Sequence, residues 1–139
     1  MTEGSLNRQT WGIAPKIDAV DRFLLDTPAA RGTIRESHPE VCFRAFAGVP
    51  MTYSKTGQPK RAFWERVAVL RGVETDVYDH LWDAAAGLEC DASDDDLLDA
   101  FAVALTARGA EDGLETLPTA PEADPRGLPM EIVSRPLGE

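Results

Sequence analysis

Apolar residues recur at helical spacing near the start of the chain. They predict a helix from about Thr10 to Leu25, because positions three or four apart share one helix face. The residues of this pattern are Ile13, Ile17, Val20 and Leu24. Pro15 lies inside the pattern, so it stands either near the start of the helix or at a kink.

A second helix is predicted over "PEVCFRAFA", residues 39–47. Pro39 suits the first helical position and Gly48 suits the position just after the helix, where a left-handed backbone is common. The residues before it, "TIRES" at 33–37, are typical of a short strand. Glu36 is therefore predicted at the end of a strand and just before a helix.

Three more helices follow a loop, "VPMTYSKTGQPK", that is marked by its glycine and prolines. The predicted ranges are Arg61 to Leu70 with Gly72 as its C-terminal cap, Asp76 to Ala86 with Gly87 as its C-terminal cap, and Ser93 to Gly109. Trp11, Trp64 and Trp82 lie in helical patterns and are predicted to be packing residues. After Gly109 the chain is proline-rich and acidic, and only "LPMEIVS" is typical of a late strand.

The few predicted strands cannot satisfy one another's backbone hydrogen bonds. A lone strand exposes unpaired amides and carbonyls, and "TIRES" has few predicted neighbours in this chain. We therefore expect a homo-oligomer, or a partner chain that completes the sheet.

The composition is that of one globular domain of 139 residues with a net charge of −10. Eleven arginines stand against three lysines, and such an acid excess with scarce lysine resembles the composition of proteins from salt-loving archaea. No apolar run approaches the roughly 20 residues of a membrane helix, and "MTEGSLNRQT" has no apolar signal-peptide core. We expect a cytoplasmic protein without a membrane partner. Cys42 and Cys90 match no metal-ligand spacing.

The charge is unevenly distributed. Residues 54–72 carry a net charge of +4, whereas residues 73–124 carry fifteen acids and only Arg108, a net charge of −14. Lys55, Lys60 and Arg61 in the basic segment are candidates for binding the phosphates of a nucleic acid. A solvated basic loop explains the same residues equally well.

The acidic run "SDDDLLDA" begins the last predicted helix. Ser93 and Asp96 fit a capping box, and Asp94 and Asp95 fall in the first turn, where the helix dipole favours anions. Asp99 lies beyond that turn and faces like charges at helical spacing. Such paired acids suit a divalent metal, since Mg²⁺ takes one or two carboxylates with water and phosphate oxygens. Helix capping with surface acidity remains the alternative.

Five motifs, in order, resemble the family of domain of unknown function 429, whose members are predicted RNase H-like nucleases. The motifs are "SLNRQTWGIAPKIDAVD", "RESHPEVCFRAFAG", "SKTGQPKR", "DDDLLDAFAVALTARG" and "GLPMEIV". The resemblance implies an α/β, RNase H-like fold, here truncated and helix-rich with a short partial sheet. It implies residues 1–110 as the C-terminal portion of that domain, and residues 111–139 as a proline-rich acidic tail.

The resemblance also implies the site. Glu36 corresponds to the acid of a later strand, and Asp95, Asp96 and Asp99 correspond to the helix acids that hold Mg²⁺ or Mn²⁺. The form "D-x-x-D-A" favours Asp96 and Asp99, with Glu36, as the catalytic set. His38 beside Glu36 is a candidate for assisting a water or a ligand, and a structural hydrogen bond explains it as well.

The chain departs from the family at its start. Members begin with a glycine-rich strand that bears an aspartate, followed by a second acidic strand, and this sequence starts after both. We therefore expect an incomplete site in a fragment, in a truncated gene product or in half of a shared site. Two functions remain open, a metal-dependent nuclease that hydrolyses phosphodiesters and a non-catalytic subunit or interaction module.

Overall fold

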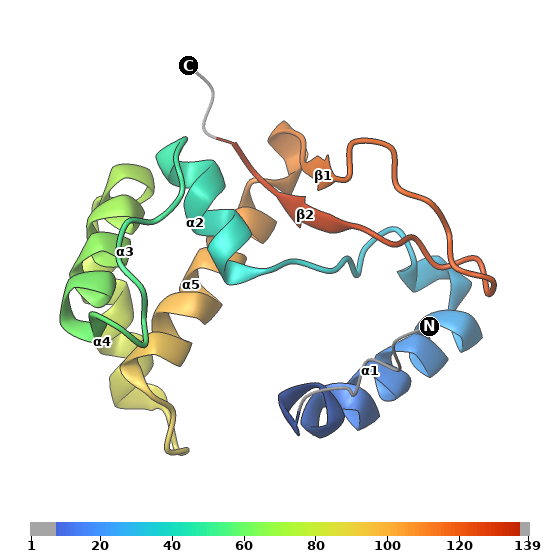
Figure 1. Ribbon diagram of the computed structural model, residues 1–139, viewed down its shortest axis with the longest axis horizontal. Coiled ribbons are helices and arrows are strands. Elements are labelled where there is room, and N and C mark those ends of the chain that lie inside the picture. The colour runs from blue at the N-terminus through green and yellow to red at the C-terminus, as the bar shows by residue number, and fades with distance from the viewer. Residues whose placement is uncertain (1–7, 137–139) are drawn as a thin grey trace. The chain divides into compact units, whose positions relative to one another are not determined.

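A computed structural model describes residues 8–136 and groups the chain into two compact units. Unit 1 comprises Met1–Arg35 and Pro121–Met130, and unit 2 comprises Glu36–Ala120 and Glu131–Glu139. Five α-helices and one two-stranded sheet make up most of the described chain (Figure 1). This is the helix-rich α/β class that the sequence predicts, while the RNase H-like topology and the division at residue 110 stay predictions.

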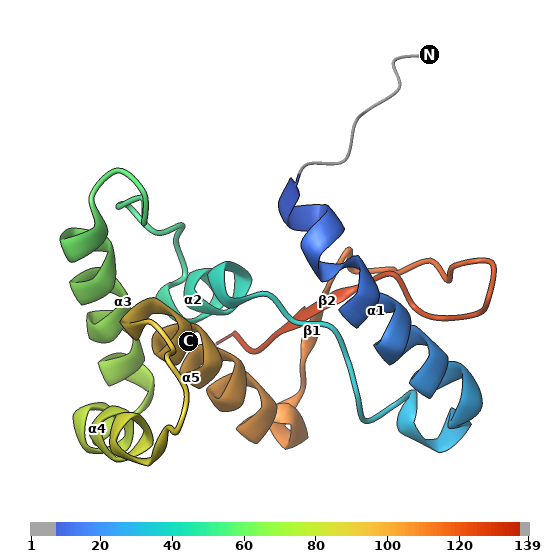
Figure 2. The ribbon, with the colours of Figure 1, turned by 90° about the horizontal axis from the view of Figure 1, so that it is seen from below.

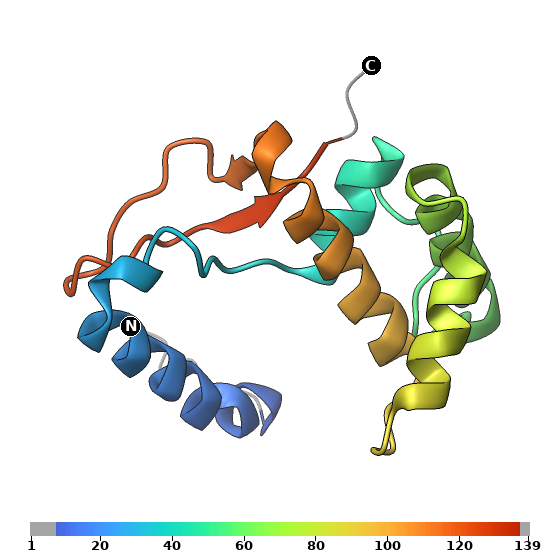
Figure 3. The same cartoon turned by 180° about the vertical axis from the view of Figure 1, so that it is seen from behind.

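Unit 1 is built on helix α1, Arg8–Asp26, which confirms the predicted helix and contains Pro15. A short 3₁₀ helix, η1 (Pro28–Ala30), follows it directly (Figure 3). The Arg31 guanidinium donates to the carbonyls of Leu24 (2.8 Å) and Leu25 (3.1 Å). It thereby satisfies carbonyls that the end of a helix leaves without partners.

The second segment of unit 1 forms a turn around Asp124. Its carboxylate accepts the amides of Arg126 and Leu128, both at 2.8 Å, and Gly127 takes the positive φ of 84° that the turn requires. Arg126 also pairs with Asp21 of α1 and so ties the turn to the helix. The rest of unit 1 leaves the apolar side of α1 exposed, at Ile13, Ile17, Val20 and Phe23.

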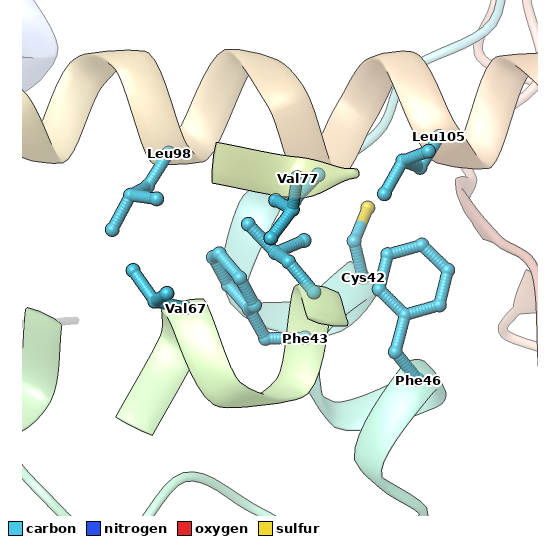
Figure 4. Packing of buried hydrophobic residues seen from close by; sticks show 9 residues of the cluster. Cys42, Phe43, Phe46, Val67, Val77, Leu98 and Leu105 are labelled. Atoms are coloured by element: carbon cyan, nitrogen blue, oxygen red, sulfur yellow. The ribbon is translucent and has the colours of Figure 1, made fainter. Parts of the chain in front are cut away.

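Four helices form the core of unit 2. They are α2 (Pro39–Ala47), α3 (Pro59–Val73), α4 (Val77–Gly87) and α5 (Asp94–Arg108). α2 packs against α3 and α5, and α4 packs against the same two helices (Figure 2). Their apolar faces meet in one cluster, which includes Cys42, Phe43, Phe46, Val67, Val77, Leu98 and Leu105 (Figure 4).

The helix ends follow local chemistry, with two differences from the sequence prediction. His38 caps α2 by accepting the amide of Glu40 on Nδ1 (3.2 Å), and Gly48 ends the helix at a φ of 71°. α3 continues through Gly72 to Val73, and Gly87 is the last residue of α4. Neither of these two glycines has a positive φ, so the predicted glycine caps are wrong.

The sheet of unit 2 is short. β1 (Glu115–Leu117) pairs antiparallel with β2 (Ile132–Ser134), with Thr116 opposite Val133. The predicted late strand is thus confirmed over its last residues. The predicted strand over 33–37 shrinks to one parallel bridge between Ser37 and Val133, because the amides of Thr33 and Ile34 bond back to Ala30 in a turn.

A buried arginine joins α2, α3 and the loop between them. Arg66 of α3 is 2% exposed, and its Nη2 donates to both carboxylate oxygens of Glu40 at 2.7 Å. Its Nη1 donates to the carbonyls of Ala62 (3.0 Å) and Tyr53 (3.4 Å). A buried guanidinium requires such partners, since an unpaired buried charge costs several kcal/mol.

We expect Glu40→Gln to lower the free energy of unfolding by about 2–3 kcal/mol, because Arg66 would keep its buried charge without a carboxylate. Urea denaturation at pH 7 measures the change. Glu89→Gln is the control, since Glu89 is exposed and has no ion pair within residues 8–136; there we expect a change within about 0.5 kcal/mol. Equal effects of the two substitutions would contradict a structural role for the Glu40–Arg66 pair.

Candidate functional site

Four charged side chains meet where α2, α5 and the loop before α3 come together in unit 2. Lys55 donates from Nζ to both carboxylate oxygens of Asp99, at 2.6 and 2.8 Å, and lies 3.7 Å from Oε1 of Glu40. Glu40 in turn holds Arg66. We call these four residues the Lys55 network. Its centre is one ammonium group between two carboxylates that come from different helices.

The loop that carries Lys55 is fastened to α3. Glu65 accepts the backbone amides of Thr52 (2.7 Å) and Tyr53 (3.0 Å) on its two carboxylate oxygens. Partial burial alone would raise the pKa of Glu65, but these amides stabilise the charged form and lower the pKa below its ordinary value. The loop geometry therefore depends on an ionised Glu65.

A cavity of about 470 Å³ opens beside the network. It is lined by Glu40, Lys55, Arg66, Arg44, Tyr53 and Met51, with neighbouring loop residues. Arg44 makes no ion pair in the part of the chain that the structure describes. Three cationic side chains against one acid make this cavity suitable for an anionic group.

The acids of α5 divide into two kinds. Ser93 Oγ accepts the amide of Asp96 (3.2 Å), and the Asp96 carboxylate accepts the hydroxyl (2.7 Å) and amide (3.2 Å) of Ser93. This confirms the predicted capping box. The Ser93 hydroxyl, followed by its amide, lowers the pKa of Asp96. Asp99 instead faces the cation Lys55.

The other predicted site residues have separate surroundings. Glu36 is exposed, and its carbonyl accepts the amide of Val133 (2.8 Å). His38 is the cap of α2, and Lys60 is exposed. No group of three or more His, Cys, Asp or Glu side chains that could hold a metal ion occurs among residues 8–136. The set Glu36, Asp95, Asp96 and Asp99 therefore stays a prediction.

Sequence reasoning missed Glu40. At the second position of a helix, a glutamate is explained by the helix dipole, and its partner Arg66 is 26 residues away. The predicted packing role of the tryptophans is wrong, because Trp64 is 60% exposed and Trp82 is 76% exposed. Helical spacing alone does not show which face of a helix is covered.

A second cavity, of about 500 Å³, lies beside the first and shares Tyr53 with it. Lys60, Arg61, Trp64 and Glu65 complete its lining. The Arg61 guanidinium carbon lies 5.5 Å from the centre of the Tyr53 ring, within the range of a cation–π contact. Aromatic and cationic groups therefore line one cavity.

The model of a family described as protein of unknown function (DUF429) matches residues 1–123. The chain belongs to this family. The resemblance drawn from the motifs is thereby confirmed. No curated protein and no solved structure matches the DUF429 chain. No helix in the described residues is long and apolar enough to cross a membrane.

The capping box predicts a pH-dependent effect. Ser93→Ala should cost about 1 kcal/mol of stability at pH 7, because one amide of the first turn loses its acceptor. The pKa of Asp96 is lower in the folded protein than its ordinary value, so the ionised carboxylate stabilises the fold. This stabilisation is fully present above the ordinary carboxyl pKa, and it is lost as the pH falls through the lowered value. The cost of Ser93→Ala should therefore shrink below about pH 4.

Melting curves between pH 7 and pH 3 measure this difference. Ser93→Thr is the control, because it keeps the hydroxyl and should retain most of the stability. A cost that is the same at every pH would contradict the coupling between Ser93 and Asp96.

Proposed function

We propose that this DUF429 chain contributes to a metal-dependent site for phosphodiester hydrolysis of RNase H-like type, acting on nucleic acid. The observation that carries the proposal is the Lys55 ammonium between Asp99 and Glu40, at 2.6 and 3.7 Å. Acids from two helices converge there on one cation. The same arrangement of oxygen donors suits Mg²⁺ or Mn²⁺.

The donor chemistry fits such an ion. Mg²⁺ is commonly held by one or two carboxylates, with water and substrate phosphate at its other positions. The carboxylates proposed to hold it are Asp99 and Glu40, which share the cation Lys55, and Glu36, Asp95 and Asp96 of the predicted set, which form no group of three with them among residues 8–136. When bound, the ion would supply activation of a water and neutralise charge on the leaving oxygen.

The cationic residues of the chain have a separate task. Lys55 is half-buried and lies at the cavity, so it is within reach of a substrate phosphate as well as of Asp99. Lys60 and Arg61 are proposed to bind the next phosphates of the backbone. His38 Nδ1 accepts the Glu40 amide, which leaves Nε2 of the neutral ring as a donor to a phosphate oxygen.

A non-catalytic interaction module is the second candidate, and a specific observation favours it. Asp96 is bonded to Ser93, Asp99 to Lys55 and Glu40 to Arg66, so each of these acids already has a partner within the chain. In this function the Lys55 network only holds helices together. The chain would then bind a partner protein through the exposed edge of its short sheet.

Mn²⁺ should separate the two functions by its effect on melting. If the acids hold a metal, a tenfold excess of Mn²⁺ over its Kd should raise the melting temperature of the wild type by about 5 °C. Asp99→Asn should abolish that rise, and without metal it should cost about 1 kcal/mol because it weakens the pair with Lys55. Lys55→Gln frees Asp99 and should keep or increase the rise.

An interaction module predicts no metal-dependent change in any of these variants. A rise of equal size in wild type and Asp99→Asn would overturn the proposed metal site. Cleavage of labelled oligonucleotides in Mn²⁺, lost in Asp99→Asn and in Glu36→Gln but kept in Glu122→Gln, would establish hydrolysis.

A further inference from the structure

The second cavity has a chemistry that the acidic residues do not explain. It brings an exposed tryptophan and a tyrosine together with Lys60 and Arg61. We propose that this cavity is a stacking platform for a base of single-stranded nucleic acid, with Trp64 as the main stacking surface. The inference rests on the proposed function for its expectation of nucleic acid, and it names the form of that substrate.

The two aromatic rings are held in place before any ligand binds. Trp64 packs edge-on against half-buried Phe63, with ring centres 5.3 Å apart and planes at 88°. Glu65 fixes the backbone of Tyr53, and Arg61 lies over the Tyr53 ring. Rings that are already ordered lose little conformational entropy on binding. The exposed face of Trp64 is therefore available for stacking.

The charges around the rings match a phosphodiester backbone. Lys60 and Arg61 precede Trp64 by four and three residues on α3, so the three side chains share one face of the helix. Lys60 makes no ion pair within the described chain. The carboxylate of Glu65 accepts hydrogen bonds from two backbone amides instead of pairing with Lys60. The platform therefore has free positive charge within a segment of net charge +4, residues 54–72.

A single strand fits this surface better than a duplex does. Bases in a duplex are stacked on one another, whereas an unpaired base offers its face to an aromatic side chain. A cavity of about 500 Å³ is large enough for one base with its sugar. Because Tyr53 also lines the cavity at Lys55, a strand stacked on Trp64 would continue toward the Lys55 network.

Binding of a fluorescein-labelled 12-mer of deoxythymidine, followed by anisotropy in EDTA at low salt, tests the platform. Trp64→Ala should weaken binding roughly tenfold or more, because stacking of one base is lost. Trp64→Phe keeps a ring and should retain most of the affinity. Trp82→Ala is the matched control, since Trp82 is at least as exposed and lies outside the cavity; its affinity should equal that of the wild type.

The charged residues have a parallel test. Lys60→Gln should reduce the slope of log K against log salt by about 0.7, the value for one lost contact with a single strand. Lys16→Gln is its control, because Lys16 is an exposed lysine outside the cavity. Melting curves of all variants check that each one is folded.

Equal losses in Trp64→Ala and Trp82→Ala, absence of binding to the 12-mer, or equal affinity for a duplex of the same length would each overturn the platform. The outcome is distinguishable from that of the metal site, because the binding assay contains no divalent ion. Binding that depends on Trp64 without a Mn²⁺ effect on melting supports the platform and overturns the metal site. A Mn²⁺ effect on melting without binding to the single strand supports the metal site and overturns the platform.

Discussion

The buried guanidinium of Arg66 is the interaction on which the arrangement of unit 2 depends. A charge that is 2% exposed must find partners for its donors, and here the partners are Glu40 on α2 and the carbonyls of Ala62 and Tyr53. Arg66 thus fixes the start of α2 against α3 and also holds the loop between them. That loop carries Tyr53 and Lys55, and Glu65 holds it as well through the amides of Thr52 and Tyr53. Arg66 and Glu65 of α3 thus together position the loop residues that line the two cavities.

The Glu40–Arg66 pair also affects how closely Lys55 approaches its two carboxylates, Glu40 and Asp99. Glu40 accepts Arg66 on both oxygens at 2.7 Å, so Lys55 lies only at 3.7 Å from Glu40 and makes its short contacts with Asp99. A carboxylate that already neutralises one cation attracts a second cation less strongly. The Lys55–Asp99 contact is therefore the stronger of the two contacts of Lys55, and it is the contact that a competing cation or phosphate has to replace.

Sequence patterns predicted the helices well, because the periodicity of the apolar residues and the capping residues act locally. Ser93, Asp96, His38 and Gly48 all lie at helix ends, within a few residues of their partners. The strands were predicted less well, since pairing joins distant segments. β1 has three residues, too few to show an alternation, and the turn at Ala30 takes up amides that a strand over residues 33–37 would need.

The candidate site was predicted in part for the same reason. Asp99 was recognised because it lies beyond the first turn of its helix, where capping no longer explains an acid. Its partner Lys55 is 44 residues away, and no local pattern connects the two. Glu40 and Trp64 each had an adequate local explanation, the helix dipole and helix packing, so nothing in the sequence pointed to their contacts.

Ionic contacts and base stacking would depend differently on salt if a nucleic acid binds at the two cavities. The whole chain carries −10, and a nucleic acid would be repelled by it over distances where salt does not screen. At physiological ionic strength the Debye length is about 8 Å, so a strand at α3 responds mainly to Lys60, Arg61 and their neighbours. As salt rises, these ionic contacts weaken, whereas stacking on an aromatic ring does not depend on screening. In the proposed platform, the contribution of Trp64 to binding would therefore persist over the widest range of salt. Lys60 and Arg61 would set how steeply the rest of the affinity falls.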